Sequence, residues 1–79
     1  MGDVGVHSKG FYYSKKFNDG KFEYRHVILP DAVVRRLPAE GRLLAEEEWR
    51  HLGVTMSAGW VHYEQHKPEP NILMFRRPL

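Results

Sequence analysis

The sequence predicts a small α+β domain, a four-stranded antiparallel sheet with two short helices, in the order β-β-α-α-β-β. Two aromatic-rich runs flank an Asp-Gly turn near the start, and two helical patterns fill the middle. Two further β-like runs enclose a proline-rich turn near the end. Because the chain has 79 residues, it has room for one domain. We expect residues 1–9 to be a flexible N-terminal segment and residues 10–79 to form this domain.

The first two strands are expected at residues 11–17 and 22–29. In the second run one face carries Phe22, Tyr24, His26 and Ile28, which alternate with the other residues. An Asp-Gly pair at residues 19–20 favours a hairpin turn, because glycine accepts the positive φ of a tight turn. Pro30 ends the second strand, since proline has no N–H to donate to a neighbouring strand.

Two helices are expected next, at residues 31–37 and 45–52. Asp31 opens the first with a charge that favours a helix N-terminus, and Pro38 closes it. The second begins with acidic residues and ends with basic ones, and Gly53 follows at the position of a C-terminal cap. No side chain at its start offers an N-terminal cap.

The last two strands are expected at residues 60–66 and 71–76, on either side of a turn with two prolines. His62 and His66 are four residues apart, a spacing that on a helix would suit zinc. On a strand we expect them on one face but roughly 13 Å apart. The sequence therefore predicts no metal site and no cofactor.

The composition excludes several classes of function. The formal net charge of +2 is too small to indicate nucleic-acid binding, and the absence of cysteine excludes disulfides and cysteine catalysis. No apolar stretch approaches the roughly 20 residues of a membrane span. The start of the chain lacks the basic and apolar regions of a signal peptide. We therefore expect an intracellular protein. Neither a nucleophile elbow nor a glycine-rich phosphate loop is present, so we expect that it is not an enzyme.

Several basic side chains are candidates for binding an anion. Arg25 lies within an expected strand, Arg77 ends another, and Lys16 ends a third. Trp60 follows a loop that contains Ser57. Guanidinium, ammonium, hydroxyl and indole N–H groups are the donors that a phosphate monoester needs. The alternative at this point is that these cations are scattered over a solvated surface.

Three segments together resemble the cyclin-dependent kinase regulatory subunit (CKS) family: Phe-Glu-Tyr-Arg-His-Val at 22–27, Gly-Trp-Val-His-Tyr at 59–63 and His-Lys-Pro-Glu-Pro at 66–70. The resemblance covers residues 11–79 and implies a four-stranded sheet with two short helices. It also implies a non-catalytic adaptor in cell-cycle control, located in the nucleus and cytoplasm. Such proteins bind phosphothreonine or phosphoserine before proline, and they tether a cyclin-dependent kinase catalytic subunit to phosphorylated substrate proteins.

The resemblance also implies two sets of site residues. The phosphate-binding residues, each a direct donor, would be Lys16, Arg25, Ser57, Trp60 and Arg77. The kinase-docking residues would be Tyr63, His66, Pro68, Glu69 and Pro70. In the family, segment 66–70 acts as a hinge, which permits either a monomer or a strand-swapped dimer. We expect the monomer to be the functional state.

Two departures from the family keep alternatives open. Glu64 and Gln65 stand where family members usually place two apolar residues against the kinase. A divergent phosphopeptide-binding module with weak or absent kinase docking is therefore the main alternative. A small nucleic-acid binder that uses basic and aromatic side chains on a sheet is a third hypothesis, which a steep loss of affinity with salt would reveal.

Overall fold

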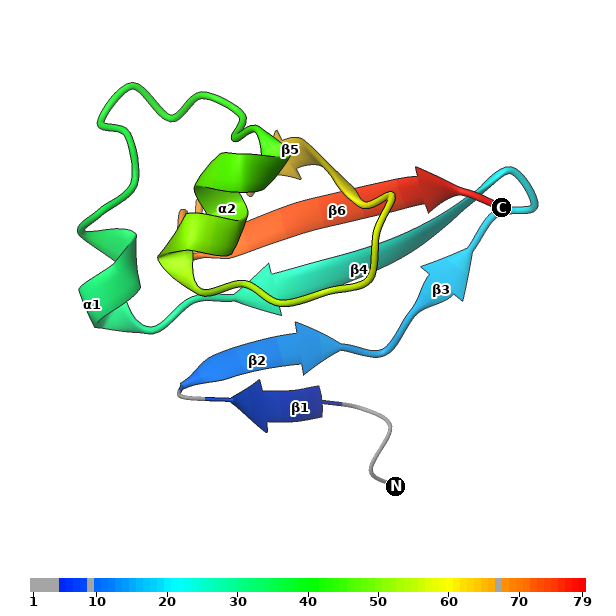
Figure 1. Cartoon of the computed structure of the whole chain (residues 1–79), viewed down its shortest axis with the longest axis horizontal. Coiled ribbons are helices and arrows are strands. Elements are labelled where there is room, and N and C mark those ends of the chain that lie inside the picture. Colours follow the sequence, from blue (N-terminus) through cyan, green and yellow to red (C-terminus); the bar gives the residue numbers. More distant parts are fainter. Residues whose placement is uncertain (1–4, 9, 67) are drawn as a thin grey trace.

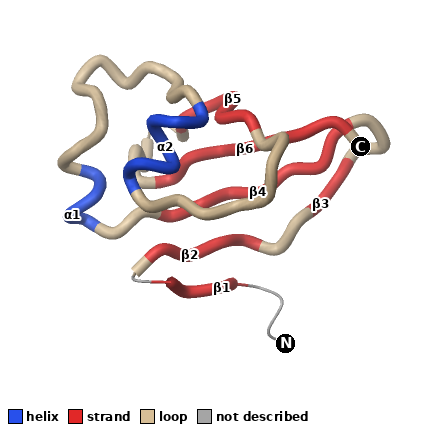
Figure 2. The backbone as a smooth tube through the Cα atoms, in the orientation of Figure 1, coloured by secondary structure: helices blue, strands red, loops and turns tan. Residues whose placement is uncertain are grey.

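The computed structural model describes residues 5–8, 10–66 and 68–79, and it places one short helix over an antiparallel sheet and another beside the end of that sheet (Figures 1 and 2). The strand order is β1-β2-β4-β6-β5, with short β3 also paired to β4. The α+β class and the antiparallel sheet are thus confirmed. The elements are β1 (Gly5–Ser8), β2 (Phe11–Ser14), β3 (Phe17–Asn18), β4 (Phe22–Ile28), α1 (Asp31–Val34), α2 (Glu46–Leu52), β5 (Val61–Gln65) and β6 (Ile72–Pro78).

The sheet has more strands than the four expected. Strand β1 pairs antiparallel with β2, although the sequence predicts no strand within residues 1–9. Its four residues are too short and too polar a run to show strand periodicity. The rest of the segment expected to be flexible, residues 1–4 and 9, lies outside the described residues.

The single strand expected at residues 11–17 is divided into β2 and β3. Tyr13 pairs with Val27, whereas Phe17 pairs with Tyr24, so one extra residue lies between the two strands. At this irregularity the Ser14 hydroxyl accepts the His26 backbone N–H at 2.8 Å, in place of a strand carbonyl. Such an insertion bends the strand and increases its twist.

The hydrophobic core lies between the sheet and the helices. Among the side chains that the structure describes, five are fully buried: Trp49, Phe75, Leu73, Val27 and Val54. The Trp49 indole meets the Phe75 ring edge-on, with centroids 5.1 Å apart. Burying a large apolar side chain contributes about 1.5–3 kcal/mol. Alternate residues of β4 and β6 therefore face α2, and no helix of the described residues lies on the other face of the sheet.

The helices are shorter than expected. Beyond α1, Arg36 and Leu37 donate their N–H groups to carbonyls three residues earlier, in a tighter turn before Pro38. Helix α2 ends at Gly53, whose φ of 114° is the left-handed cap conformation.

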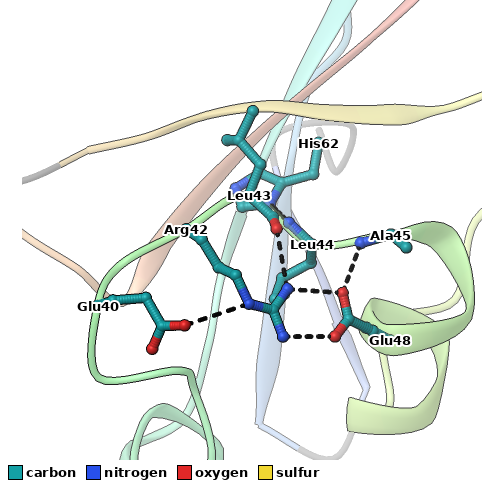
Figure 3. A network of polar contacts seen from close by, with 7 residues as sticks. All are labelled: Glu40, Arg42, Leu43, Leu44, Ala45, Glu48 and His62. Atoms are coloured by element: carbon teal, nitrogen blue, oxygen red, sulfur yellow. Dashed lines mark hydrogen bonds and ion pairs between the residues drawn. The ribbon is translucent and has the colours of Figure 1, made fainter.

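The N-terminus of α2 is capped from within the helix (Figure 3). Ala45 has no side-chain acceptor, but its N–H donates to the Glu48 carboxylate at 2.8 Å. Arg42 donates to both oxygens of the same carboxylate, at 2.9 and 2.7 Å. The Arg42 hydrogen bonds, followed by that of Ala45, lower the pKa of Glu48 to about 2.

The expectation that His62 and His66 share a face is wrong. A bulge between His62 and Glu64 adds one residue to β5, which inverts the alternation of side chains. His62 is therefore buried, and its Nδ1 accepts the Leu44 N–H at 2.9 Å (Figure 3). His66 lines a hollow on the opposite, uncovered face.

Candidate phosphate site and docking face

Three of the sequence-predicted phosphate residues are in direct contact. The Ser57 Oγ accepts one hydrogen bond from Arg77 Nη1 at 2.8 Å and one from Trp60 Nε1 at 3.3 Å. The Arg77 guanidinium also lies 4.7 Å above the Trp60 ring. A hydroxyl that accepts twice has one proton left to donate. Ser57 can therefore offer that proton to an anion.

Arg25 lies on the same face of the sheet, on the neighbouring strand. In the β4–β6 register Glu23 is opposite Arg77, and Arg25 is two residues further along β4. The Nε of Arg25 donates to the Ser14 carbonyl at 3.0 Å, and its guanidinium lies 6.0 Å from the centre of the Tyr13 ring. Both contacts hold the half-buried side chain in place.

Lys16 makes no hydrogen bond or ion pair with these residues in the described part of the chain, and it lies in the link between β2 and β3. Phe17 pairs with Tyr24, so extending that register by one residue places Lys16 opposite Arg25. Paired residues of antiparallel strands project to the same face. The Lys16 side chain is exposed, which leaves its ammonium accessible to a ligand.

An acidic residue that the sequence analysis did not single out also belongs to this cluster. Glu23 accepts the Nε–H of Arg77 at 2.5 Å, and both side chains are largely buried. The alternation of β4, which puts Glu23 and Arg25 on one face, could have indicated it. Three cations and one carboxylate leave a surplus of positive charge, which suits a doubly charged tetrahedral anion.

The opposite face of the sheet, away from α2, carries a strip of aromatic rings from Phe17, Tyr24 and Tyr63. Tyr63 packs on Tyr24, with ring centroids 5.7 Å apart, and Phe17 stacks on the other side of Tyr24 at 5.4 Å. Arg76 lies 5.0 Å above the Tyr63 ring. Tyr63 is the one predicted docking residue within this strip, and it reaches this face because it alternates with buried His62, which lies on the helix-covered face.

The other predicted docking residues gather at the turn between β5 and β6. His66 Nε2 lies 3.5 Å from a carboxylate oxygen of Glu69, and Pro68 and Pro70 are exposed nearby in the turn. A hollow of 220 Å³ beside them is lined by His26, His66, Ile72 and Met74. Burial, and then the nearby His66, lower the pKa of His26.

Glu64 lies on this docking face as well. It pairs in register with Met74, one of the residues that line the hollow, and its side chain is exposed. The carboxylate also contributes to raising the pKa of Tyr63, after the larger effect of burial. The departure from the apolar family pattern therefore falls within the predicted docking surface.

A larger hollow, of 610 Å³, lies beside α2 and contains none of the ten predicted site residues. Within the described part of the chain, no group of three or more His, Cys, Asp or Glu residues could hold a metal ion. No helix in that same part is long and apolar enough to cross a membrane.

Comparison with known proteins identifies the family. The family described as cyclin-dependent kinase regulatory subunit matches residues 11–79. The chain belongs to this family. It is 58% identical over 71 residues to cyclin-dependent kinases regulatory subunit 2 of Xenopus laevis, covering 90% of this chain and 89% of that protein. It is 56% identical over 71 residues to the cyclin-dependent kinases regulatory subunit of Drosophila melanogaster, with 90% and 95% covered.

A third relative is the probable cyclin-dependent kinases regulatory subunit of Physarum polycephalum, which is 63% identical over 67 residues, with 85% of this chain and 79% of that protein covered. These matches make the chain a regulatory subunit of the cell-cycle kinases and support kinase binding.

Proposed function

We propose that this regulatory subunit binds phosphothreonine or phosphoserine followed by proline, using Lys16, Arg25, Ser57, Trp60 and Arg77. The observation that carries the proposal is the Ser57 hydroxyl, which two donors orient beside Arg77. Arg25 lies on the same face of the next strand. One cation, Arg77, thus contacts the hydroxyl directly, and a second, Arg25, lies on the same face of the neighbouring strand.

The charges of the cluster support this ligand. A phosphate monoester carries about −1.5 to −2 charges near neutral pH and has three strong acceptor oxygens. Charge-assisted hydrogen bonds from guanidinium groups are about twice as strong as neutral ones. Arg25 and Arg77 are therefore expected to contribute most of the affinity, and the uncharged donors to orient the phosphate.

The second part of the proposal concerns the kinase. Tyr63, His66, Pro68, Glu69 and Pro70 would contact the catalytic subunit through the uncovered face of the sheet. Since Arg77 lies on the helix-covered face and Tyr63 on the other, both ligands can bind together. Tethering of this kind raises the local substrate concentration to ~mM for a short link. We also propose that the functional state is a monomer and that it acts in the nucleus and cytoplasm.

Binding of a phosphothreonine-proline peptide and its unphosphorylated twin, measured by calorimetry, tests the phosphate site. Arg77→Ala should weaken binding of the phosphopeptide by at least about 50-fold, because charge-assisted bonds are lost. Arg76→Ala is the matched control, since it removes the same charge from the neighbouring residue on the opposite face. Equal affinities of the two variants would refute the assignment. Arg25→Ala should behave like Arg77→Ala.

A second candidate function keeps the phosphate site and omits the kinase. The exposed Glu64 carboxylate favours it, because burying an unpaired carboxylate against a kinase costs several kcal/mol. Titration of the wild-type protein into a purified cyclin-dependent kinase catalytic subunit separates the two. Micromolar or tighter binding supports the adaptor, whereas no binding by the folded protein would support the second candidate.

A further inference from the structure

Glu23 and Arg77 form a cross-strand pair at the edge of the proposed phosphate site. The two residues are directly opposite in the β4–β6 register, and the Glu23 carboxylate accepts the Nε–H of Arg77 at 2.5 Å. Only 19% of the Glu23 side chain and 25% of the Arg77 side chain are exposed. A pair this protected from water is held more tightly than an ordinary surface ion pair.

The remaining contacts of Arg77 show what this pairing does. Nη1 donates to the Ser57 hydroxyl at 2.8 Å and to the Ala58 carbonyl at 3.3 Å. The guanidinium also lies over the Trp60 ring, 4.7 Å from its centroid. Across the described residues, Nη2 has no hydrogen-bond partner. The Nε and Nη1 groups of Arg77 therefore donate to protein, and the N–H groups of Nη2 are left for a ligand.

The other arginine of the site is anchored in the same way. The Nε of Arg25 donates to the Ser14 carbonyl, and its terminal nitrogens have no hydrogen-bond partner among the described residues. Both guanidinium groups are thus attached through Nε. The anchor of Arg77 differs because it is a charged carboxylate, which also reduces the positive charge of the site.

We propose that Glu23 is a positioning residue of the phosphate site, which aims the Arg77 guanidinium at the phosphate by holding its Nε–H. This inference rests on the proposed phosphopeptide binding. Glu23 has two opposing effects on a bound anion. Its charge repels the phosphate, whereas its hydrogen bond preorganises Arg77 and so reduces the loss of side-chain freedom on binding.

Two substitutions with the same change in charge separate these effects. Glu23→Gln keeps an oxygen that can accept the Nε–H, and Glu23→Ala keeps none. With a phosphothreonine-proline peptide in calorimetry, Glu23→Gln should bind as tightly as the wild type or up to about tenfold more tightly. Glu23→Ala should bind at least about tenfold more weakly than Glu23→Gln, because Arg77 is no longer aimed.

Controls exclude general effects of charge and folding. Glu47→Gln and Glu47→Ala make the same changes at an exposed position of α2 and should bind the peptide equally well. Glu23→Thr, which is too short to reach Nε and suits a strand, replaces Glu23→Ala if that variant does not fold. If Glu23 only stabilised the fold, replacing it in a variant that still folds would not change the protection of the Arg77 Nε–H from exchange, which NMR measures. This N–H should stay protected from exchange in Glu23→Gln and lose protection in Glu23→Ala.

The outcomes distinguish this inference from the proposed function. Wild-type protein that binds neither peptide nor inorganic phosphate would overturn the phosphate site, and this inference with it. Wild-type binding combined with equal affinities of Glu23→Gln and Glu23→Ala would overturn the positioning role alone. The expected result is that both variants fold and that Glu23→Gln binds the phosphopeptide more tightly than Glu23→Ala.

Discussion

The buried imidazole of His62 should make the stability of the fold depend on pH. Its side chain is 2% exposed, and Nδ1 accepts the Leu44 N–H at 2.9 Å, so the neutral ring carries its proton on Nε2. Burial lowers the pKa of His62. A proton added at Nδ1 would place two N–H donors face to face and would charge a group that is shielded from water. Protonation of the His62 ring is therefore unfavourable in the folded protein.

The sign and size of the effect follow from proton linkage. An unfolded histidine titrates near 6.5, and the pKa of His62 is lower in the folded state. Its contribution to stability is thus fully present above about pH 6.5 and is lost as the pH falls below that value. One histidine contributes a slope of at most about 1.4 kcal/mol per pH unit. Asp19 and Glu48 have pKa values of about 2, so their contributions are lost only below the ordinary carboxylate range.

His62→Asn tests this reasoning. An asparagine oxygen can replace Nδ1 as the acceptor for Leu44, and it does not titrate. Urea unfolding at pH 7.5, 6.5 and 5.5 should give a free energy of unfolding that falls in the wild type by up to about 1.4 kcal/mol more than in His62→Asn. His51→Asn, at an exposed position of α2, should retain the wild-type slope. Equal slopes for His62→Asn and the wild type would refute the argument.

Three further predictions concern single side chains. Gly53→Ala should lower the free energy of unfolding by about 2 kcal/mol in urea unfolding, because φ is 114° and the new Cβ would lie 2.9 Å from the Phe11 ring. Tyr13→Phe should cost about 1–2 kcal/mol in the same assay, since its hydroxyl accepts the Thr55 N–H at 2.9 Å. Glu64→Gln should tighten kinase binding about fivefold in calorimetry, because an exposed charge need no longer be buried. Weaker binding by Glu64→Gln would show instead that the kinase pairs a cation with Glu64.

Local patterns predicted most of the fold. The alternation of Phe22, Tyr24, His26 and Ile28 placed β4, and Gly53 marked the end of α2. The inserted residue between β2 and β3 was not predictable, because the Ser14–His26 hydrogen bond that replaces a strand bond joins residues distant in sequence. The bulge in β5 was missed for a similar reason, so His62 and His66 were wrongly expected on one face.

The candidate site shows the same limit. Sequence chemistry selected cations and a hydroxyl, but only the strand register brings Arg77 beside Ser57 and Glu23. Arg25 was recognised as a basic strand residue, and its anchor on the Ser14 carbonyl follows from the pairing of β2 with β4. Side chains from several strands come together only when those strands pair in a particular register, and short-range sequence patterns do not specify that register.

The two-surface adaptor is tested most directly by asking whether kinase and phosphopeptide bind this protein together. The affinity for a phosphothreonine-proline peptide would be measured by calorimetry, with and without a saturating cyclin-dependent kinase catalytic subunit. We expect the two affinities to be equal within about twofold, because Arg77 and Tyr63 lie on opposite faces of the sheet. Loss of peptide binding in the presence of the kinase would contradict the two-surface adaptor.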